Sequence, residues 1–240
     1  MSKPILALSA LVAFTSLPTV ALADLAFNVG ATTDYRYRGV SQTRLKPALQ
    51  GGVDYSNGPF YLGAWASTIK WIKDAKGDAD VEIDIYGGYK GEIQKDFTYD
   101  IGVLTYQYPS NKLNPSANTT EIYGALTFGP ATAKYSHSVS NLFGFAKSKN
   151  SGYLDLSASF EIVDGWSLTP HLGYQKVSGG SDYSYTDYAL TASKDFSGLV
   201  VSAAIINAAV KTLGGSPAYA SPSGKDLGKT GLVLGVKYNF

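Results

Sequence analysis

Apolar and polar residues alternate along most of this chain with a period of two. The clearest run is the last one, in which every second residue from Leu232 to Phe240 is apolar. Successive side chains of a β-strand point to opposite faces, so each such run predicts a strand with one apolar and one polar face. No long stretch keeps the 3.6-residue period of an amphipathic helix. The pattern therefore predicts an all-β fold.

Twelve alternating runs follow one another after the first 23 residues. They lie at about 25–37, 46–56, 59–68, 80–91, 96–108, 119–129, 130–140, 151–163, 165–176, 183–195, 197–208 and 230–240. Most hold about 10 residues or more, which is enough to cross a bilayer as a tilted strand.

The connections between these runs differ in length in a regular order. Short turns lie near 56–58, 92–95, 129–130, 164–165 and 196–197. Long connections alternate with them, near 38–45, 69–79, 109–118, 141–150, 177–182 and 209–229. This alternation is typical of outer-membrane barrels, in which short turns face the periplasm and longer loops face the outside. We therefore expect residues 24–240 to form a single antiparallel, up-and-down transmembrane β-barrel of about twelve strands.

Residues 1–23 have the features of a cleaved secretory signal peptide. Lys3 supplies a positive charge, an apolar run extends from Ile5 to about Leu17, and the segment 21–23 fits the small-residue cleavage rule. The apolar run is short for a membrane-spanning helix, which needs about 20 residues. We expect export with cleavage before Asp24, followed by insertion of the mature chain into the bacterial outer membrane.

Composition narrows the function classes. The formal net charge of +1 argues against nucleic-acid binding, which needs a basic excess or patch. The absence of cysteine excludes a disulfide scaffold and cysteine-based zinc sites. The mean hydropathy of -0.04 argues against a bundle of membrane-spanning helices but permits an alternating barrel. The sequence gives no basis for a cofactor or a metal site.

Charged residues gather on the polar faces of the runs. A lysine or arginine facing lipid at the bilayer midplane costs about 2–4 kcal/mol, so these faces are expected to line the interior. The acidic and basic residues in the middle of runs are Asp34, Asp54, Glu82, Asp84, Asp100, Glu121, Asp155, Glu161 and Asp187, with Arg36, Arg38, Lys90, Lys134 and Lys237. Our pore-lining candidates are these residues without Asp54 and Lys90, together with His171. Their acidic excess predicts a mild preference for cations.

The three arginines of the mature chain, Arg36, Arg38 and Arg44, lie close together in the sequence. Arg36 and Arg38 share the polar face of the first run with Asp34, near the expected outer mouth. Two interpretations stay open. The guanidinium groups form a constriction that handles carboxylate or phosphate groups, or they belong to an ion-pair network that holds the wall in register.

Two further segments suggest partners. The final strand, with Tyr238 and Phe240 two residues apart at its end, resembles the C-terminal recognition strand that the barrel-assembly machinery reads in bacterial outer-membrane proteins. We assign these two residues as an assembly signal. The connection from Thr68 to Asp78 mixes apolar residues with lysines. It is expected to fold over the mouth, to sit at the lipopolysaccharide head groups of the membrane, or to be solvated around one packed Trp.

Several segments carry a family resemblance. They include Asp34 to Thr43 (DYRYRGVSQT), Pro47 to Tyr55 (PALQGGVDY) and Asp84 to Tyr89 (DIYGGY). In these the chain resembles the TorF family of porin-like proteins, over most of the mature chain and most densely in its first half. The resemblance implies a bacterial outer-membrane barrel with a porin role.

The sequence favours a porin-like channel for the passive diffusion of small hydrophilic solutes or ions. Barrels of about eight strands leave no channel and those of about sixteen leave a wide one, so twelve strands permit a narrow pore. A closed structural or adhesive barrel stays possible, because loops and long side chains can fill the lumen.

A lipid hydrolase is the third class of function. It needs a nucleophile beside a general base, yet His137 and His171 are followed two positions later by Val139 and Gly173 rather than by serine. We expect no enzymatic activity. Conductance for a porin, phospholipid turnover for an enzyme, and neither for a closed barrel would separate the three classes.

Overall fold

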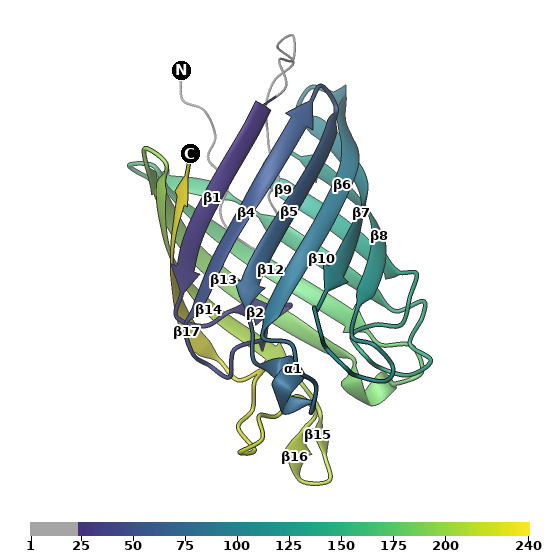
Figure 1. Cartoon of the computed structure of the whole chain (residues 1–240). Coiled ribbons are helices and arrows are strands. Elements are labelled where there is room, and N and C mark those ends of the chain that lie inside the picture. Colours follow the sequence, from purple (N-terminus) through teal and green to yellow (C-terminus); the bar gives the residue numbers. More distant parts are fainter. Residues whose placement is uncertain (1–23) are drawn as a thin grey trace.

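The computed structural model describes residues 24–240, and a closed antiparallel barrel forms its body (Figure 1). The expected signal peptide lies outside the described residues. The main sheet has 13 strands, of which β10 and β11 are two pieces of one wall strand, so the wall has twelve. The all-β, twelve-strand prediction is confirmed.

In chain order the wall strands are β1 (Asp24–Thr32), β4 (Ala48–Asn57), β5 (Phe60–Thr68), β6 (Val81–Gln94), β7 (Phe97–Gln107), β8 (Thr119–Phe128), β9 (Ala131–Ser138), β10 (Gly152–Ala158) with β11 (Phe160–Val163), β12 (Trp166–Lys176), β13 (Tyr185–Phe196), β14 (Leu199–Ala209) and β17 (Gly231–Asn239).

The sheet closes on itself by pairing its first and last wall strands, and no gap interrupts the wall at β10. Strand β1 pairs with β17 as well as with β4, and β10 pairs with both β9 and β12. Next to the last register pair, the backbone N–H of Phe240 donates to the carbonyl of Phe27, and that of Phe27 donates to Phe240, at 3.0 and 2.8 Å. Because every wall strand has a neighbour on both sides, the barrel leaves no long open edge in the described chain.

The two ends of the barrel differ, and we call them the turn end and the loop end. At the turn end β1 begins, β17 finishes and five two-residue turns join the strands (top of Figure 1). Each turn has at least one residue with positive φ, as tight hairpins require: Gly58, Asp96, Gly129, Asp164 with Gly165, and Ser197 with Gly198. All long connections lie at the loop end, in the order that the sequence predicted.

Short secondary-structure elements lie at the loop end. They are β2 (Arg36–Tyr37), β3 (Val40–Ser41), α1 (Trp71–Asp74), η1 (Ser181–Tyr183), β15 (Thr212–Leu213) and β16 (Ser216–Pro217). Within residues 24–240, the helices are all too short or too polar to span a membrane. The connection that carries α1 is not a solvated loop, because Ile69 and Ile72 are fully buried and pack against residues inside the barrel.

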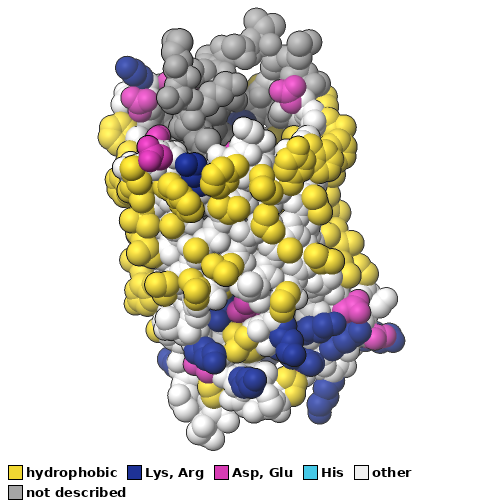
Figure 2. Space-filling view, turned by 90° about the vertical axis from the view of Figure 1, so that its left-hand side faces the viewer, with side chains coloured by type: hydrophobic (Ala, Val, Ile, Leu, Met, Phe, Trp, Pro, Cys, Tyr) yellow, Lys and Arg dark blue, Asp and Glu magenta, His cyan; other side chains and the backbone are white. Residues whose placement is uncertain are grey.

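The outer surface of the wall is apolar. Large aliphatic side chains are more than two-fifths exposed on nearly every wall strand: Leu25, Val29, Leu49, Leu62, Ile85, Ile101, Val103, Ile122, Leu126, Leu154, Leu172, Leu190, Ile205 and Leu234. Figure 2 shows hydrophobic side chains spread over the wall, with charged side chains gathered toward the two ends. Soluble proteins rarely expose so large a continuous apolar surface, whereas lipid-facing barrel walls require one.

The predicted end of the first strand is wrong, and this changes where Arg36 and Arg38 lie. The first run was expected to continue to residue 37, but β1 ends at Thr32 and the chain then leaves the wall. Residues 33–47, which we call the inward loop, turn into the lumen and form the β2–β3 hairpin, with Arg36 opposite Ser41. The β2–β3 hairpin continues the alternation of apolar and polar residues that marks a strand. The period of two in the sequence therefore could not distinguish the hairpin from a wall strand. A smaller break at Ser159 divides the expected run 151–163 into β10 and β11.

Candidate functional site

The inward loop owes its shape to a tight turn at its tip. Arg38 and Gly39 both have positive φ, at 47° and 78°, which gives the two-residue turn of the β2–β3 hairpin. Gly39 has a second requirement. A Cβ placed there would lie 2.7 Å from the Cβ of Asp187 and 3.0 Å from that of Ala208, on β13 and β14. The tip of the loop therefore rests directly on the lumen side of these two strands.

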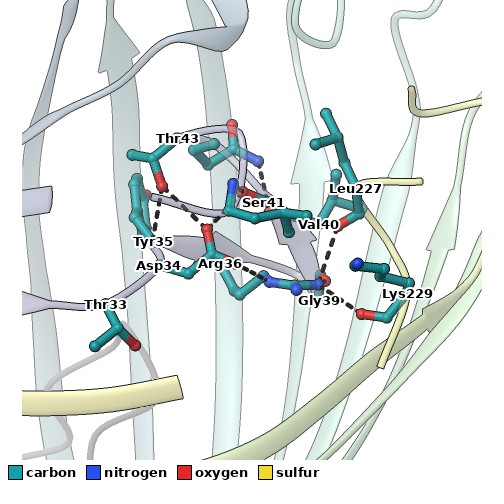
Figure 3. Close-up of polar contacts among 12 residues, drawn as sticks. Thr33, Asp34, Tyr35, Arg36, Gly39, Val40, Ser41, Thr43, Leu227 and Lys229 are labelled. Carbon is teal, nitrogen blue, oxygen red and sulfur yellow. Dashed lines mark hydrogen bonds and ion pairs between the residues drawn. The ribbon is translucent and has the colours of Figure 1, made fainter. Parts of the chain in front are cut away.

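The carboxylate of Asp34 organises the base of the inward loop. It accepts a hydrogen bond from Ser41 Oγ at 2.5 Å, lies 3.0 Å from Thr43 Oγ1 and pairs with Arg36 (Figure 3). The Nη1 of Arg36 donates to the carbonyls of Leu227 and Lys229 at 3.0 and 3.1 Å. These contacts tie the loop to the segment that precedes β17.

Arg38 connects the tip of the loop to the opposite wall. Its Nη2 donates to Glu121 Oε2 on β8 and its Nη1 to Gln175 Oε1 on β12, both at 2.6 Å. The guanidinium also lies over the ring of Tyr153 on β10, 4.3 Å from the centroid. The side chains of Arg38 and Glu121 are 6% and 1% exposed, so this ion pair is shielded from solvent.

Tyrosines of the inward loop contact the remaining side of the barrel. Tyr35 Oη donates to Glu82 Oε1 on β6 at 2.6 Å, and Tyr37 Oη donates to Tyr106 Oη on β7 at 2.6 Å. The Tyr37 ring also packs edge-on against Phe143. The loop thus touches β6, β7, β8, β10, β12, β13 and β14, and it crosses the lumen at the loop end.

The turn-end half of the lumen is less deeply buried than the loop-end half. There, tyrosine rings lie over inward-facing glycines: a Cβ on Gly88 would lie 2.4 Å from Tyr61 Oη, and one on Gly102 would lie 2.5 Å from Tyr123 Oη. Tyr61 Oη donates to Asp100 Oδ1 at 2.6 Å, and all these polar side chains are only half-buried. Neighbouring tyrosine rings therefore occupy the space beside these inward-facing glycines.

The two histidines have different surroundings. His171 Nε2 lies 3.0 Å from Asp155 Oδ2 and 3.2 Å from Tyr153 Oη, and its Nδ1 lies 3.6 Å from Asp187 Oδ1. His137 faces outward, with Nε2 3.2 Å from the side-chain oxygen of Asn150. Among residues 24–240, no group of three or more His, Asp or Glu side chains is arranged to hold a metal ion.

The structure distributes the sequence-derived candidates over three groups. The inward loop carries Asp34, Arg36 and Arg38; the wall of the loop-end half and middle carries Glu82, Asp84, Glu121, Lys134, Asp155, His171 and Asp187; and the turn-end half carries Asp100, Glu161 and Lys237. Arg38 with Glu121, and His171 with its two aspartates, are brought together. Glu161 and Lys237 make no ion pair within the described chain. Lys134 lies over the Tyr123 ring, 3.6 Å from its centroid.

Sequence reasoning missed the neutral partners of this network. Gln175 and the tyrosines at 35, 37, 106 and 153 hold the buried charges but were not among the candidates. Those of these residues that belong to the wall lie on the polar faces of the alternating runs. That position was the signal in the sequence that could have identified them as lumen residues.

Comparison with solved structures shows the fold. The chain is similar to the structure described as "KdgM porin in complex with disordered oligogalacturonate", with a TM-score of 0.56 and 9% identity over 91% of this chain and 99% of that chain. It also matches the outer membrane protein OprD from Pseudomonas aeruginosa, with a TM-score of 0.40 and 13% identity over 90% and 65% of the two chains. A mutant of the Rh. blastica porin gives 0.40 and 14% over 80% and 55%. At 9% identity, the similarity to the KdgM structure establishes a shared fold only. The other two matches have TM-scores of 0.40 and carry no further argument.

Sequence comparison gives the family. No curated protein matches the chain. One family model matches residues 19–240, which is nearly the whole chain, and it is described as "Bacterial protein of unknown function (Gcw_chp)". The chain therefore belongs to the Gcw_chp family of bacterial proteins.

Proposed function

We propose that this protein is a porin-like channel of the bacterial outer membrane, constricted at its outer mouth by the inward loop. The observation that carries the proposal is a twelve-strand barrel with an apolar outer wall and a charged interior. Charged groups such as Asp54, Asp100 and Lys237 remain half-buried in the turn-end half, so polar surface extends into the lumen there. Such an interior suits small hydrophilic solutes or ions.

The proposal includes the sidedness and the route to the membrane. Residues 1–23 serve as the cleaved signal peptide, Tyr238 and Phe240 are read by the barrel-assembly machinery, and the loop end faces outward toward lipopolysaccharide. Membership of the TorF family of porin-like proteins is part of the same proposal. No catalytic step is included, because the side-chain partners of His137 and His171 are an amide, a phenol and carboxylates rather than a serine or threonine hydroxyl.

A closed barrel is the second candidate, and a specific observation favours it. The carboxyl side chains of Glu82, Glu121 and Asp187 are each 1% exposed, so the lumen around the inward loop is tightly packed. In a porin this region is a constriction that opens by fluctuation, whereas in a structural barrel it is permanent.

Conductance tests the proposal. The full-length chain is expressed with its own leader, recovered from the outer membrane, checked for a heat-modifiable gel shift and inserted into planar bilayers. A porin-like channel predicts stable, ohmic current steps, with a reversal potential in a salt gradient that indicates cation preference. A folded, inserted barrel without any current steps would contradict the channel, and anion selectivity would contradict the charge assignment.

A further inference from the structure

A groove that carries three basic residues lies at the loop end of the barrel. One wall is the base of the inward loop, with Arg44 and Lys46, and the other is the segment from Thr68, the last residue of β5, to Lys70. The groove has a volume of about 380 Å³, while one water occupies about 30 Å³ of liquid, so the groove holds a group much larger than a water molecule.

Hydrogen bonds join the two walls of this groove. The backbone N–H of Lys70 donates to the carbonyl of Gln42 at 2.8 Å, and Thr68 Oγ1 accepts from the N–H of Leu49 at 3.1 Å. Thr43 Oγ1 donates to the carbonyl of Lys46 at 2.6 Å. The cationic side chains are therefore mounted on backbone segments whose positions are fixed with respect to each other.

Two of the groove's cations, Lys46 and Lys70, form no ion pair in the described chain. Arg44 pairs with Asp74, but neither Lys46 nor Lys70 lies within ion-pair distance of a carboxylate in the described chain. Other exposed lysines at the loop end are paired: Lys73 lies 2.9 Å from Asp80, for example. Lys70 acts on the carboxylate of Asp80 only at longer range, so the ammonium groups of Lys46 and Lys70 are placed to bind a phosphate through charge-assisted hydrogen bonds.

The position of the groove identifies the source of that phosphate. Leu49, 68% exposed on the lipid-facing side of β4, lies three residues from Lys46, and Thr68 is exposed at the outer end of β5. The groove therefore opens just beyond the apolar belt, where lipid head groups begin. Figure 2 shows Lys and Arg side chains gathered at this end of the barrel, next to the hydrophobic wall.

We propose that this groove binds a phosphate group of lipopolysaccharide in the outer leaflet, with Lys46, Lys70 and Arg44 as its ligands. This site rests on the proposed location in the outer membrane and on the outward-facing loop end, but it does not depend on an open pore. Its role is to anchor the base of the inward loop to the surrounding lipid.

Binding in detergent tests the site. The purified full-length protein is titrated with bisphosphorylated lipid A, and tryptophan emission, to which Trp71 beside the groove contributes, is followed. Near an anionic surface each lysine is expected to contribute about fivefold to the affinity. The double variant Lys46→Gln/Lys70→Gln is therefore expected to bind about 25-fold more weakly than the wild type. The matched control Lys73→Gln/Lys112→Gln makes the same change in net charge at the same end of the barrel and is expected to bind within twofold of the wild type.

Several outcomes would overturn the site. Equal weakening in both double variants would show only a general charge effect. Unchanged affinity for lipid A from which the phosphates have been removed would exclude phosphate as the ligand. Tight binding of inorganic phosphate without binding of lipid A would reassign the groove to a soluble anion. Because the measurement is made in detergent, a barrel that conducts no current can still support the site, and a conducting barrel can still refute it.

Discussion

The loop-end and turn-end halves of the lumen contain similar residue types, yet they use them differently. At the loop end, Arg38 reaches across the lumen to Glu121, and both side chains are almost completely shielded from solvent. At the turn end, Tyr61 and Asp100 form a hydrogen bond of the same length but stay half-buried. The difference comes from the inward loop, which supplies the loop-end half with an extra layer of side chains. A charged lumen residue that the inward loop covers is therefore buried and structural. A charged lumen residue that the loop does not cover faces solvent.

Removal of the Arg38 guanidinium should give the largest loss of stability. Arg38→Ala leaves the carboxylate of Glu121 buried without its cation, and breaking a buried pair costs about 3–5 kcal/mol. Lys237→Ala, at a half-buried cation of the turn end, is the matched control and should cost about 1 kcal/mol or less. Urea unfolding followed by the heat-modifiable gel shift measures both; equal losses would break the comparison.

A double replacement sharpens the same point. Arg38→Met combined with Glu121→Met removes both charges and keeps most of the side-chain volume. Replacing a buried ion pair with apolar residues is often close to neutral, so we expect the double variant to recover most of the loss caused by Arg38→Met alone. An additive loss in the double-mutant cycle would show that the pair is not coupled.

A side chain at the tip of the inward loop should give the next largest effect. Gly39→Ala forces a Cβ into a left-handed residue and against Asp187 and Ala208, so strain and overpacking together should cost about 2–4 kcal/mol. Gly58→Ala at the turn end has a similar φ, 58°, but no atom within 4 Å of the new Cβ. It should cost about 1 kcal/mol, from backbone strain alone. Chemical denaturation of the two variants should therefore separate the two causes, and a Gly39 variant as stable as the Gly58 variant would show that the tip does not pack closely.

Two of the tyrosine hydroxyls that donate to carboxylates, one in each half of the lumen, should differ more modestly in their contribution to stability. Tyr35→Phe removes a donor from Glu82, which is 1% exposed, and hydrogen bonds to buried charged groups contribute about 1.5–3 kcal/mol. Tyr61→Phe removes the donor to half-buried Asp100, where water can replace it, so we expect a loss below about 1 kcal/mol. The measurement is again the midpoint of unfolding, and the reverse order would contradict the assignment of the buried half to the loop end.

The smallest effect is expected outside the barrel wall and depends on pH. Lys112 holds the pKa of Asp78 below its usual value, and Lys73 does the same for the pKa of Asp80, in both cases through a hydrogen bond and charge attraction. Because these folded-state pKa values lie below that of an unfolded aspartate, about 3.9, the pairs stabilise the loops at neutral pH, and the contribution is lost as the pH falls through the folded values.

Thermal unfolding between pH 7 and pH 3 checks this sign. The double variant Asp78→Asn/Asp80→Asn should be slightly less stable than the wild type at pH 7, with the gap closing below about pH 4. Both carboxylates are solvent-exposed, so raising the salt concentration should shrink the gap as well. A gap that widens toward low pH would mean that these pairs do not stabilise the folded state.

The wall could be predicted from the sequence because period-two alternation follows directly from strand geometry. Even the two least regular runs, near 59–68 and 197–208, are wall strands, β5 and β14. The alternating lengths of the connections likewise predicted which end carries the turns.

The site could be predicted only in part. Arg36 and Arg38 were expected on the first wall strand, but the β2–β3 hairpin continues the same alternation inside the barrel. Which polar residues lie together depends on that inward fold, a long-range event that local periodicity does not encode. The same limit applies to Gly88 and Gly102, because the tyrosines that cover them belong to neighbouring strands.

The measurement that tests the central claim most directly compares two proteins in planar bilayers: the wild type and a variant whose inward loop, residues 33–47, is replaced by a short Gly-Ser linker. If the barrel is a channel constricted by that loop, the wild type should show small current steps and the variant clearly larger ones, with weaker discrimination between cations and anions. A correctly inserted variant that conducts no more than the wild type would contradict the account, because the lumen would then be closed by the wall itself.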